Sequence, residues 1–198
     1  MALDRGSPLA LTVLTLLNHQ PLHPYGIQRL LKQWGKDLVV NVGQRAGLYR
    51  TIDRLSEAGL IRVRETGRDQ QYPERTVYEI TEAGRERLTT WLDDMLSRPK
   101  QEFPQFPAAL ANAMLLGPGG LAEALERRAA AVERTLAELE AGLTAEEDLP
   151  RITMLECEYL REVTAAEARW LRAVIADLRE GRLEWSREQL EQVSSARE

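Results

Sequence analysis

The residues best suited to binding chemistry are arginines that gather in two neighbouring stretches of the chain. They are Arg45, Arg50, Arg54, Arg62, Arg64, Arg68 and Arg75. A guanidinium group is always charged, and its planar fork of N–H donors fits a phosphate group or the edge of a guanine base. Acidic residues are interleaved with these arginines, so the same stretches could instead form a solvated surface of ion pairs. Position in the fold has to decide between the two interpretations.

Residue patterns that would indicate catalysis or metal binding are missing from the sequence. It contains neither a glycine-rich phosphate loop nor the G-x-S-x-G motif of a nucleophilic serine. His19 and His23 are four residues apart, but Pro21 between them prevents a shared helical face. The sequence neighbours of Cys157 are acidic, which does not favour a reactive thiolate. We therefore expect no enzyme activity, no cofactor and no metal site, and we interpret the two histidines as turn residues.

Charge is distributed unevenly along the 198 residues, whose formal net charge is −5. Residues 1–98 hold 14 Lys and Arg against 12 Asp and Glu, whereas residues 99–198 hold 12 against 19. This asymmetry predicts a mildly basic N-terminal domain and an acidic C-terminal one. The apolar run near the N-terminus is too short to span a bilayer, and it lacks the features of a signal peptide. We expect a cytoplasmic protein with no membrane partner.

Three helices are predicted in the first part of the chain. Ser7-Pro8 is typical of a helix start, and Pro24 to Trp34 has apolar residues at helical spacing. A third helix is predicted to begin at Asn41, because Asn41 and Gln44 fit the pattern of a capping box. Its predicted buried stripe consists of Leu48, Ile52 and Leu55. The outward side of its first turns then presents Gln44, Arg45, Ala46, Tyr49 and Arg50.

A β-hairpin and a fourth helix complete this domain. Residues 60–66 alternate apolar side chains with arginine, and residues 76–80 form a second β-branched and aromatic run. Thr81-Glu82 then caps a helix that ends before Pro99. Three helices followed by a hairpin are the plan of a winged helix-turn-helix, in which the third helix and the hairpin face DNA. The arginines lie on these two elements, which favours a nucleic-acid contact.

The C-terminal half is predicted to be helical. Prolines mark residues 99–107 as a linker, and two long amphipathic helices follow, at residues 121–143 and at about 152–178. Two such helices leave apolar stripes that need a second layer, which a partner subunit or the first helix of the chain could supply. We expect a homodimer interface at these residues: Leu136, Leu139, Leu155, Tyr159, Val163, Trp170 and Val174.

The fold class expected is therefore mainly α, with an N-terminal winged helix-turn-helix that carries a small β-hairpin wing, and a C-terminal antiparallel helical dimerisation domain. The predicted boundaries are residues 1–98 for the winged domain, 99–107 for the linker and 108–198 for the dimerisation domain.

Several motifs resemble the PadR family of bacterial transcriptional regulators. They are NVGQRAGLYRTIDRLSEAGLI, GRDQQYPERTVYEITEAGRERLTTWL and, farther along the chain, FPQFPAALANAMLL and EYLREVTAAEARWLRAVIADLREGRLEW. The resemblance covers nearly the whole chain, although Gly47 replaces the small hydroxyl residue usual before the LY pair. It implies a homodimeric repressor that binds double-stranded operator DNA and is released by a small molecule or another signal, and it implies that Tyr49 faces the operator.

The site expected on this basis joins the third helix to the wing. Gln44, Arg45, Tyr49 and Arg50 are expected nearest the base edges, and Arg64, Arg68 and Arg75 are expected to hold the DNA backbone. We expect an effector to be a hydrophobic or aromatic small molecule. The competing hypothesis is a winged-helix protein-interaction module that does not bind DNA, which the acidic net charge would suit.

Overall fold

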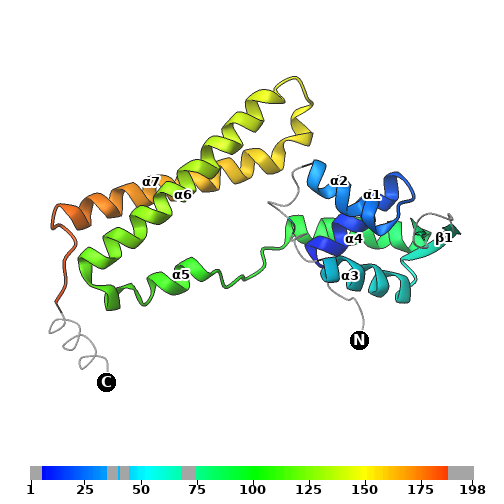
Figure 1. Cartoon of the computed structure of the whole chain (residues 1–198), viewed down its shortest axis with the longest axis horizontal. Coiled ribbons are helices and arrows are strands. Elements are labelled where there is room, and N and C mark those ends of the chain that lie inside the picture. The colour runs from blue at the N-terminus through cyan, green and yellow to red at the C-terminus, as the bar shows by residue number, and fades with distance from the viewer. Residues whose placement is uncertain (1–5, 35–39, 41–44, 68–74, 187–198) are drawn as a thin grey trace. The chain divides into compact units, whose positions relative to one another are not determined.

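The computed structural model describes residues 6–34, 40, 45–67 and 75–186. The chain divides into two compact units, Met1–Gln101 and Glu102–Glu198, which we call the winged unit and the helical unit. The fold is mainly helical with one two-stranded antiparallel hairpin, which confirms the expected fold class (Figure 1).

The first two helices of the winged unit begin with side-chain caps. Helix α1 (Pro8–His19) has Ser7 as its N-cap, and the Ser7 hydroxyl accepts a hydrogen bond of 3.2 Å from the backbone N–H of Ala10. Helix α2 (Pro24–Gln33) is capped by His23, whose Nδ1 accepts a hydrogen bond of 2.7 Å from the N–H of Gly26. His23 is thus a turn residue at the start of a helix, as its sequence context predicts.

Helix α3 (Arg45–Glu57) is held to the winged unit by the stripe that its periodicity predicts. Leu48, Ile52 and Leu55 are buried in a core to which α1 and α2 also contribute. The exposed residues on the side of α3 away from this core include Ala46, Arg50, Asp53 and Glu57. The predicted capping box of Asn41 and Gln44 lies outside the described residues. Trp34, the C-cap residue that follows α2, is about half exposed.

The wing consists of β1 (Ile61–Gly67) and β2 (Arg75–Ile80), paired antiparallel. Ile61 and Ile80 lie opposite each other and are buried at the base of the hairpin. The expected alternation fails at Val63, which is exposed, because the hairpin extends beyond the core and a register shift follows this residue. Leu22 adds a short bridge to β2, in which the backbone N–H and C=O of Leu22 both bond to Tyr78.

Helix α4 (Glu82–Ser97) closes the winged unit. Thr81 caps it by accepting from the N–H of Gly84, and the same hydroxyl donates a hydrogen bond of 2.7 Å to the carbonyl of Gly59. A Cβ atom at Gly84 would lie 2.1 Å from the carbonyl oxygen of Leu60, so α4 can approach the start of the wing this closely only with glycine there. Trp91 is the buried anchor of the helix.

The helical unit contains α5 (Gln105–Leu110), the 3₁₀ turns η2 (Ala113–Leu116) and η3 (Arg151–Thr153), and the long helices α6 (Gly117–Ala145) and α7 (Leu155–Arg179). Helices α6 and α7 run antiparallel, since Glu126 pairs with Arg179 while Glu133 pairs with Arg172 (Figure 1). Helix α5 begins inside the segment predicted as a linker. Gly117, at φ 68°, turns the chain from η2 directly into α6, so this helix begins at Gly117 rather than at the predicted residue 121.

The face of α7 that meets α6 differs from the stripe predicted for the dimer interface. The buried residues of α7 are Ala168, Leu171 and Leu178, and Leu171 and Leu178 belong to the core that α6 completes. Leu155, Tyr159 and Val163, which were predicted for the dimer interface, are exposed in the single chain. At about 100° per residue the mean directions of these two stripes differ by roughly 130°, so α7 carries apolar residues on two separate faces.

Candidate nucleic-acid interface

The outer face of α3 presents an aromatic and a basic side chain close to its N-terminal end. Tyr49 is 51% exposed, and Arg50 beside it is also exposed. The Arg50 Nε donates a hydrogen bond of 3.2 Å to the carbonyl of Ala46, which holds the side chain along the helix. Arg50 forms no ion pair with any described residue, so its terminal N–H groups can bind a phosphate or a base edge.

Gly47 lies on the same turns of α3. Apart from its chain neighbours and the backbone of its own helix, a Cβ atom built at Gly47 would meet no described atom within 4 Å. Its carbonyl accepts a hydrogen bond of 2.9 Å from the hydroxyl of Thr51. The surrounding structure therefore leaves room for a side chain at Gly47, and its glycine is not required by packing.

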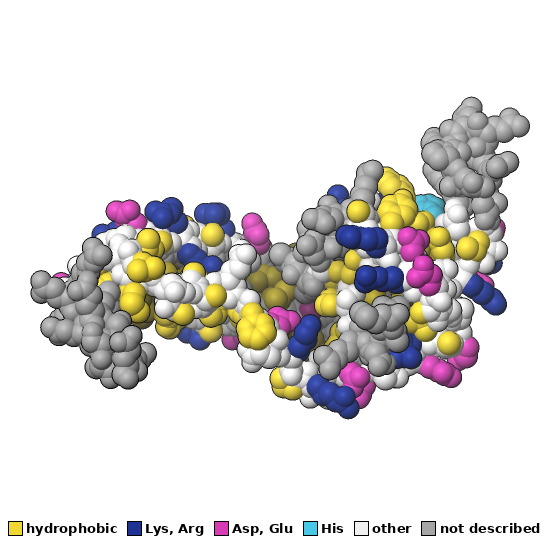
Figure 2. Space-filling view, turned by 90° about the horizontal axis from the view of Figure 1, so that it is seen from below, with side chains coloured by type: hydrophobic (Ala, Val, Ile, Leu, Met, Phe, Trp, Pro, Cys, Tyr) yellow, Lys and Arg dark blue, Asp and Glu magenta, His cyan; other side chains and the backbone are white. Residues whose placement is uncertain are grey.

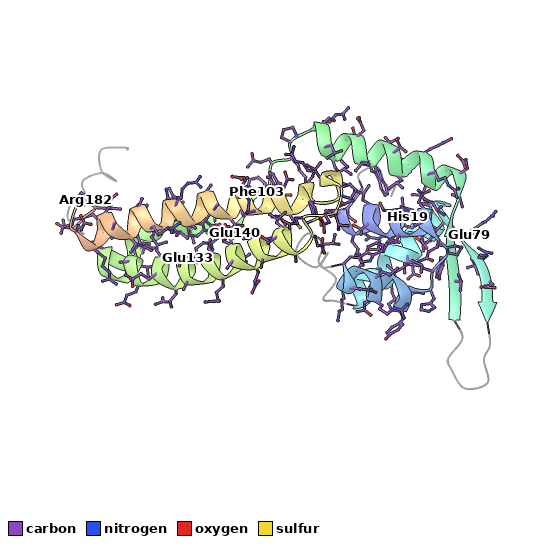
Figure 3. The ribbon with its side chains drawn as sticks, turned by 90° about the horizontal axis from the view of Figure 1, so that it is seen from above. His19, Glu79, Phe103, Glu133, Glu140 and Arg182 are labelled. Carbon is purple, nitrogen blue, oxygen red and sulfur yellow. The ribbon has the colours of Figure 1, made fainter. Side chains whose placement is uncertain are left out.

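The second basic element is β1 of the wing, where two arginines differ in their environment. Arg62 faces Glu79 across the hairpin, and its Nη2 lies 2.7 Å from Glu79 Oε1 (Figure 3). Arg64 is exposed and forms no ion pair with the part of the chain that the structure describes. Arg64 therefore presents an uncompensated positive charge, whereas the charge of Arg62 is largely neutralised.

Tyr78 lies where the wing meets α3. Its ring packs against the core of the winged unit, and its backbone bonds to Leu22. Burial raises the pKa of the Tyr78 phenol, and the charges of Asp53 and Tyr49 raise this pKa further. Sequence patterns did not single out Tyr78 because a single tyrosine in a strand has no distinctive signal.

The predicted DNA-contacting residues thus fall on two elements of the winged unit. Tyr49 and Arg50 lie on α3 and Arg64 lies on β1, while Arg45 is the first residue of α3 and Arg75 the first residue of β2. Gln44 and Arg68 lie outside the described residues.

The residues predicted for a dimer interface separate into two groups. Tyr159 is 68% exposed on α7, and Leu155, Val163 and Trp170 are also exposed. Figure 2 shows hydrophobic side chains open on the surface of the helical unit, at the left of the view. Leu139, in contrast, is only 6% exposed in the single chain, and Val174 packs against the core between α6 and α7. Leu139 is thus buried within the single chain, and Val174 and Leu136 are partly buried.

Other kinds of site find little support in the described part of the chain. Among its residues, no group of three His, Cys, Asp or Glu side chains is placed to hold a metal ion. Within the same ranges, none of the helices combines the length and the apolar character that crossing a bilayer requires.

Comparison with known proteins agrees with this geometry. Residues 13–90 match the model of the transcriptional regulator PadR-like family. No match was found among curated proteins. Among solved structures, the chain is similar to Bacillus subtilis PadR in complex with operator DNA, with a TM-score of 0.71 and 18% identity over 86% of this chain and 98% of that one.

Two further structures have the same fold. Bacillus subtilis PadR in complex with p-coumaric acid gives a TM-score of 0.65 at 18% identity, over 87% of this chain and 99% of that one. The Vibrio cholerae virulence activator AphA gives a TM-score of 0.62 at 20% identity, over 87% and 98%. The likeness extends through both units of the chain.

Proposed function

We propose that this chain, whose residues 13–90 match the model of the PadR-like family, is a DNA-binding transcriptional regulator that acts as a homodimer on a pseudo-palindromic operator. The α3 helix of each subunit enters a major groove, and the two half-sites are related by the two-fold axis of the dimer. The observation that carries this proposal is that Tyr49 and Arg50 are exposed on α3 while Arg64 is exposed on the wing. Arg64 forms no ion pair with the described residues.

The two elements have different tasks in this complex. Tyr49 and Arg50, together with Gln44 and Arg45, are the residues proposed to lie nearest the base edges and to read sequence. Arg64, with Arg68 and Arg75 in the wing, contacts phosphates and sets orientation and affinity. Arg62 contributes less, because its charge is already paired with Glu79.

The outward stripe of α7 is the proposed contact between subunits. Leu155, Tyr159, Val163 and Trp170 form an exposed apolar surface, since α6 packs on the stripe that includes Leu171 and Leu178. Isologous pairing of this stripe with its copy would remove these side chains from water and contribute the hydrophobic core of a dimer.

We further propose that the regulator is a cytoplasmic repressor released by a hydrophobic or aromatic small molecule. The related Bacillus subtilis PadR was solved in complex with p-coumaric acid, which supports an effector of this class. A ligand acts as an inducer only when it binds the DNA-free conformation more tightly than the DNA-bound one.

The test of DNA binding begins with selection of fragments from genomic DNA, followed by fluorescence anisotropy at several salt concentrations. A regulator should prefer the selected operator to unrelated DNA by at least about 10³-fold, and its affinity should fall steeply with salt. Binding that is weak on every fragment and insensitive to salt would instead support the protein-interaction module. Thermal-shift measurements with phenolic acids and other hydrophobic compounds test the effector.

A further inference from the structure

Asp53 places a carboxylate on the face of α3 that is proposed to meet DNA. It lies four residues after Tyr49, one helical turn along the same side, and it is exposed. The stripe that anchors α3, which includes Ile52, is buried in the core of the winged unit. Packing therefore gives no reason for an acidic side chain at this position.

Asp53 forms no ion pair within the described part of the chain. Arg50 is three residues away on the helix, within reach of an ion pair, yet its Nε donates to the carbonyl of Ala46. Arg54 is adjacent and exposed, and no ion pair between Asp53 and any described cation is formed. The charge of Asp53 also reaches the wing, where it contributes to the raised pKa of Tyr78.

A free carboxylate affects the two kinds of DNA complex differently. Binding to unrelated sequences depends almost wholly on phosphate contacts, so a negative charge on the contact face weakens it directly. In the operator complex, base contacts fix the helix in one orientation. There a carboxylate over the groove can accept a hydrogen bond from an amino group of cytosine or adenine, which offsets the repulsion.

We propose that Asp53 is a specificity-determining residue that weakens binding to DNA without the operator sequence. This inference rests on the proposed function. Asp53 would weaken binding to unrelated DNA, whereas Tyr49 and Arg50 would strengthen binding to the operator.

The test compares Asp53→Asn with Asp93→Asn in the full-length protein. Both variants remove one negative charge from an exposed aspartate of the winged unit, but Asp93 lies on α4 rather than on α3. Affinities for the selected operator and for a scrambled duplex of equal length are measured at one salt concentration. Thermal unfolding of both variants checks that each is folded.

We expect Asp53→Asn to strengthen binding to the scrambled duplex by about threefold to tenfold, since an exposed charge contact is weak but a dimer contains it twice. The affinity for the operator should change by less than about twofold, and Asp93→Asn should leave the ratio of the two affinities unchanged. An equal effect of Asp53→Asn on both duplexes, or a loss of affinity confined to the operator, would overturn the inference alone. Absence of salt-dependent DNA binding by the wild type would overturn the proposed function as well.

Discussion

The guanidinium carbon of Arg128 lies 3.5 Å from the centroid of the Phe106 ring, in a cation–π contact between α6 and α5. The Nε of Arg128 also donates a hydrogen bond of 2.5 Å to Glu167 on α7. On α7, Trp170 meets the Phe106 ring edge-on at a centroid distance of 6.0 Å. Three helices are thereby joined at one aromatic side chain, and α5 is fixed to the hairpin of α6 and α7.

This arrangement predicts that Phe106→Ala destabilises the helical unit by about 1–3 kcal/mol. The expected loss is below that of a fully buried phenylalanine because Phe106 is partly exposed. Phe103→Ala is the matched control, since Phe103 is 89% exposed (Figure 3), and it should change stability by less than about 0.5 kcal/mol. Urea unfolding followed by circular dichroism measures both, and equal midpoints for the two variants would contradict a structural role of the contact.

Arg50→Ala should weaken operator binding by about 1–3 kcal/mol and relax the preference at one base position, because the unpaired guanidinium is expected at a base edge. Arg134→Ala, which removes an exposed arginine of α6, serves as the control of equal charge change. Gel-shift titrations on the operator and on its single-base variants give the result. Unchanged affinity of the Arg50 variant would count against the proposed orientation of α3.

Arg64→Ala should lower affinity on all sequences alike and reduce the slope of log affinity against log salt by about one for each subunit. Arg62→Ala should have a smaller effect on this slope, because Glu79 already neutralises Arg62. The two variants differ by only two positions on one strand, so the comparison isolates the free charge. Identical slopes would mean that the ion pair opens when DNA binds.

The double variant Tyr159→Glu, Val163→Glu should convert a dimer into monomers, because it places charges on the outward stripe of α7. We expect the dimer dissociation constant to rise by more than about tenfold. Affinity for the full operator should fall with it, since one subunit reaches only one half-site. Ala141→Glu on the exposed surface of α6 is the control, and sedimentation equilibrium is the measurement. A dimer that survives the double variant would place the subunit contact elsewhere.

Local patterns were sufficient to predict much of the winged unit. The start of α1 at Ser7-Pro8 and the buried stripe of α3 depend on caps and on periodicity within a few residues, and both are confirmed. The register of the wing could not be predicted, because the shift after Val63 depends on how the hairpin meets the core. The sequence therefore could not show that Arg62 forms an ion pair with Glu79 while Arg64 forms none with the described residues.

The packing of α7 against α6 could not be predicted from the sequence either. Both of its stripes are apolar, and the stripe with Tyr159 and Trp170 was assigned to the dimer interface, without a prediction of which residues meet α6. The face against α6 instead contains Ala168, which is completely buried in the single chain, while those two aromatic residues remain exposed. The choice between the stripes depends on how closely two helices approach, which is a property of the pair.

The backbone bonds between Leu22 and Tyr78, 3.0 Å and 2.9 Å long, have a mechanical consequence. Leu22 lies in the turn that leads into α2, and Tyr78 lies in the second strand of the wing. The hairpin cannot pivot away from the helix-turn-helix without breaking both bonds and disturbing the core around Tyr78. We therefore expect a signal that releases DNA to displace the winged unit as a rigid body, with its hinge outside that unit.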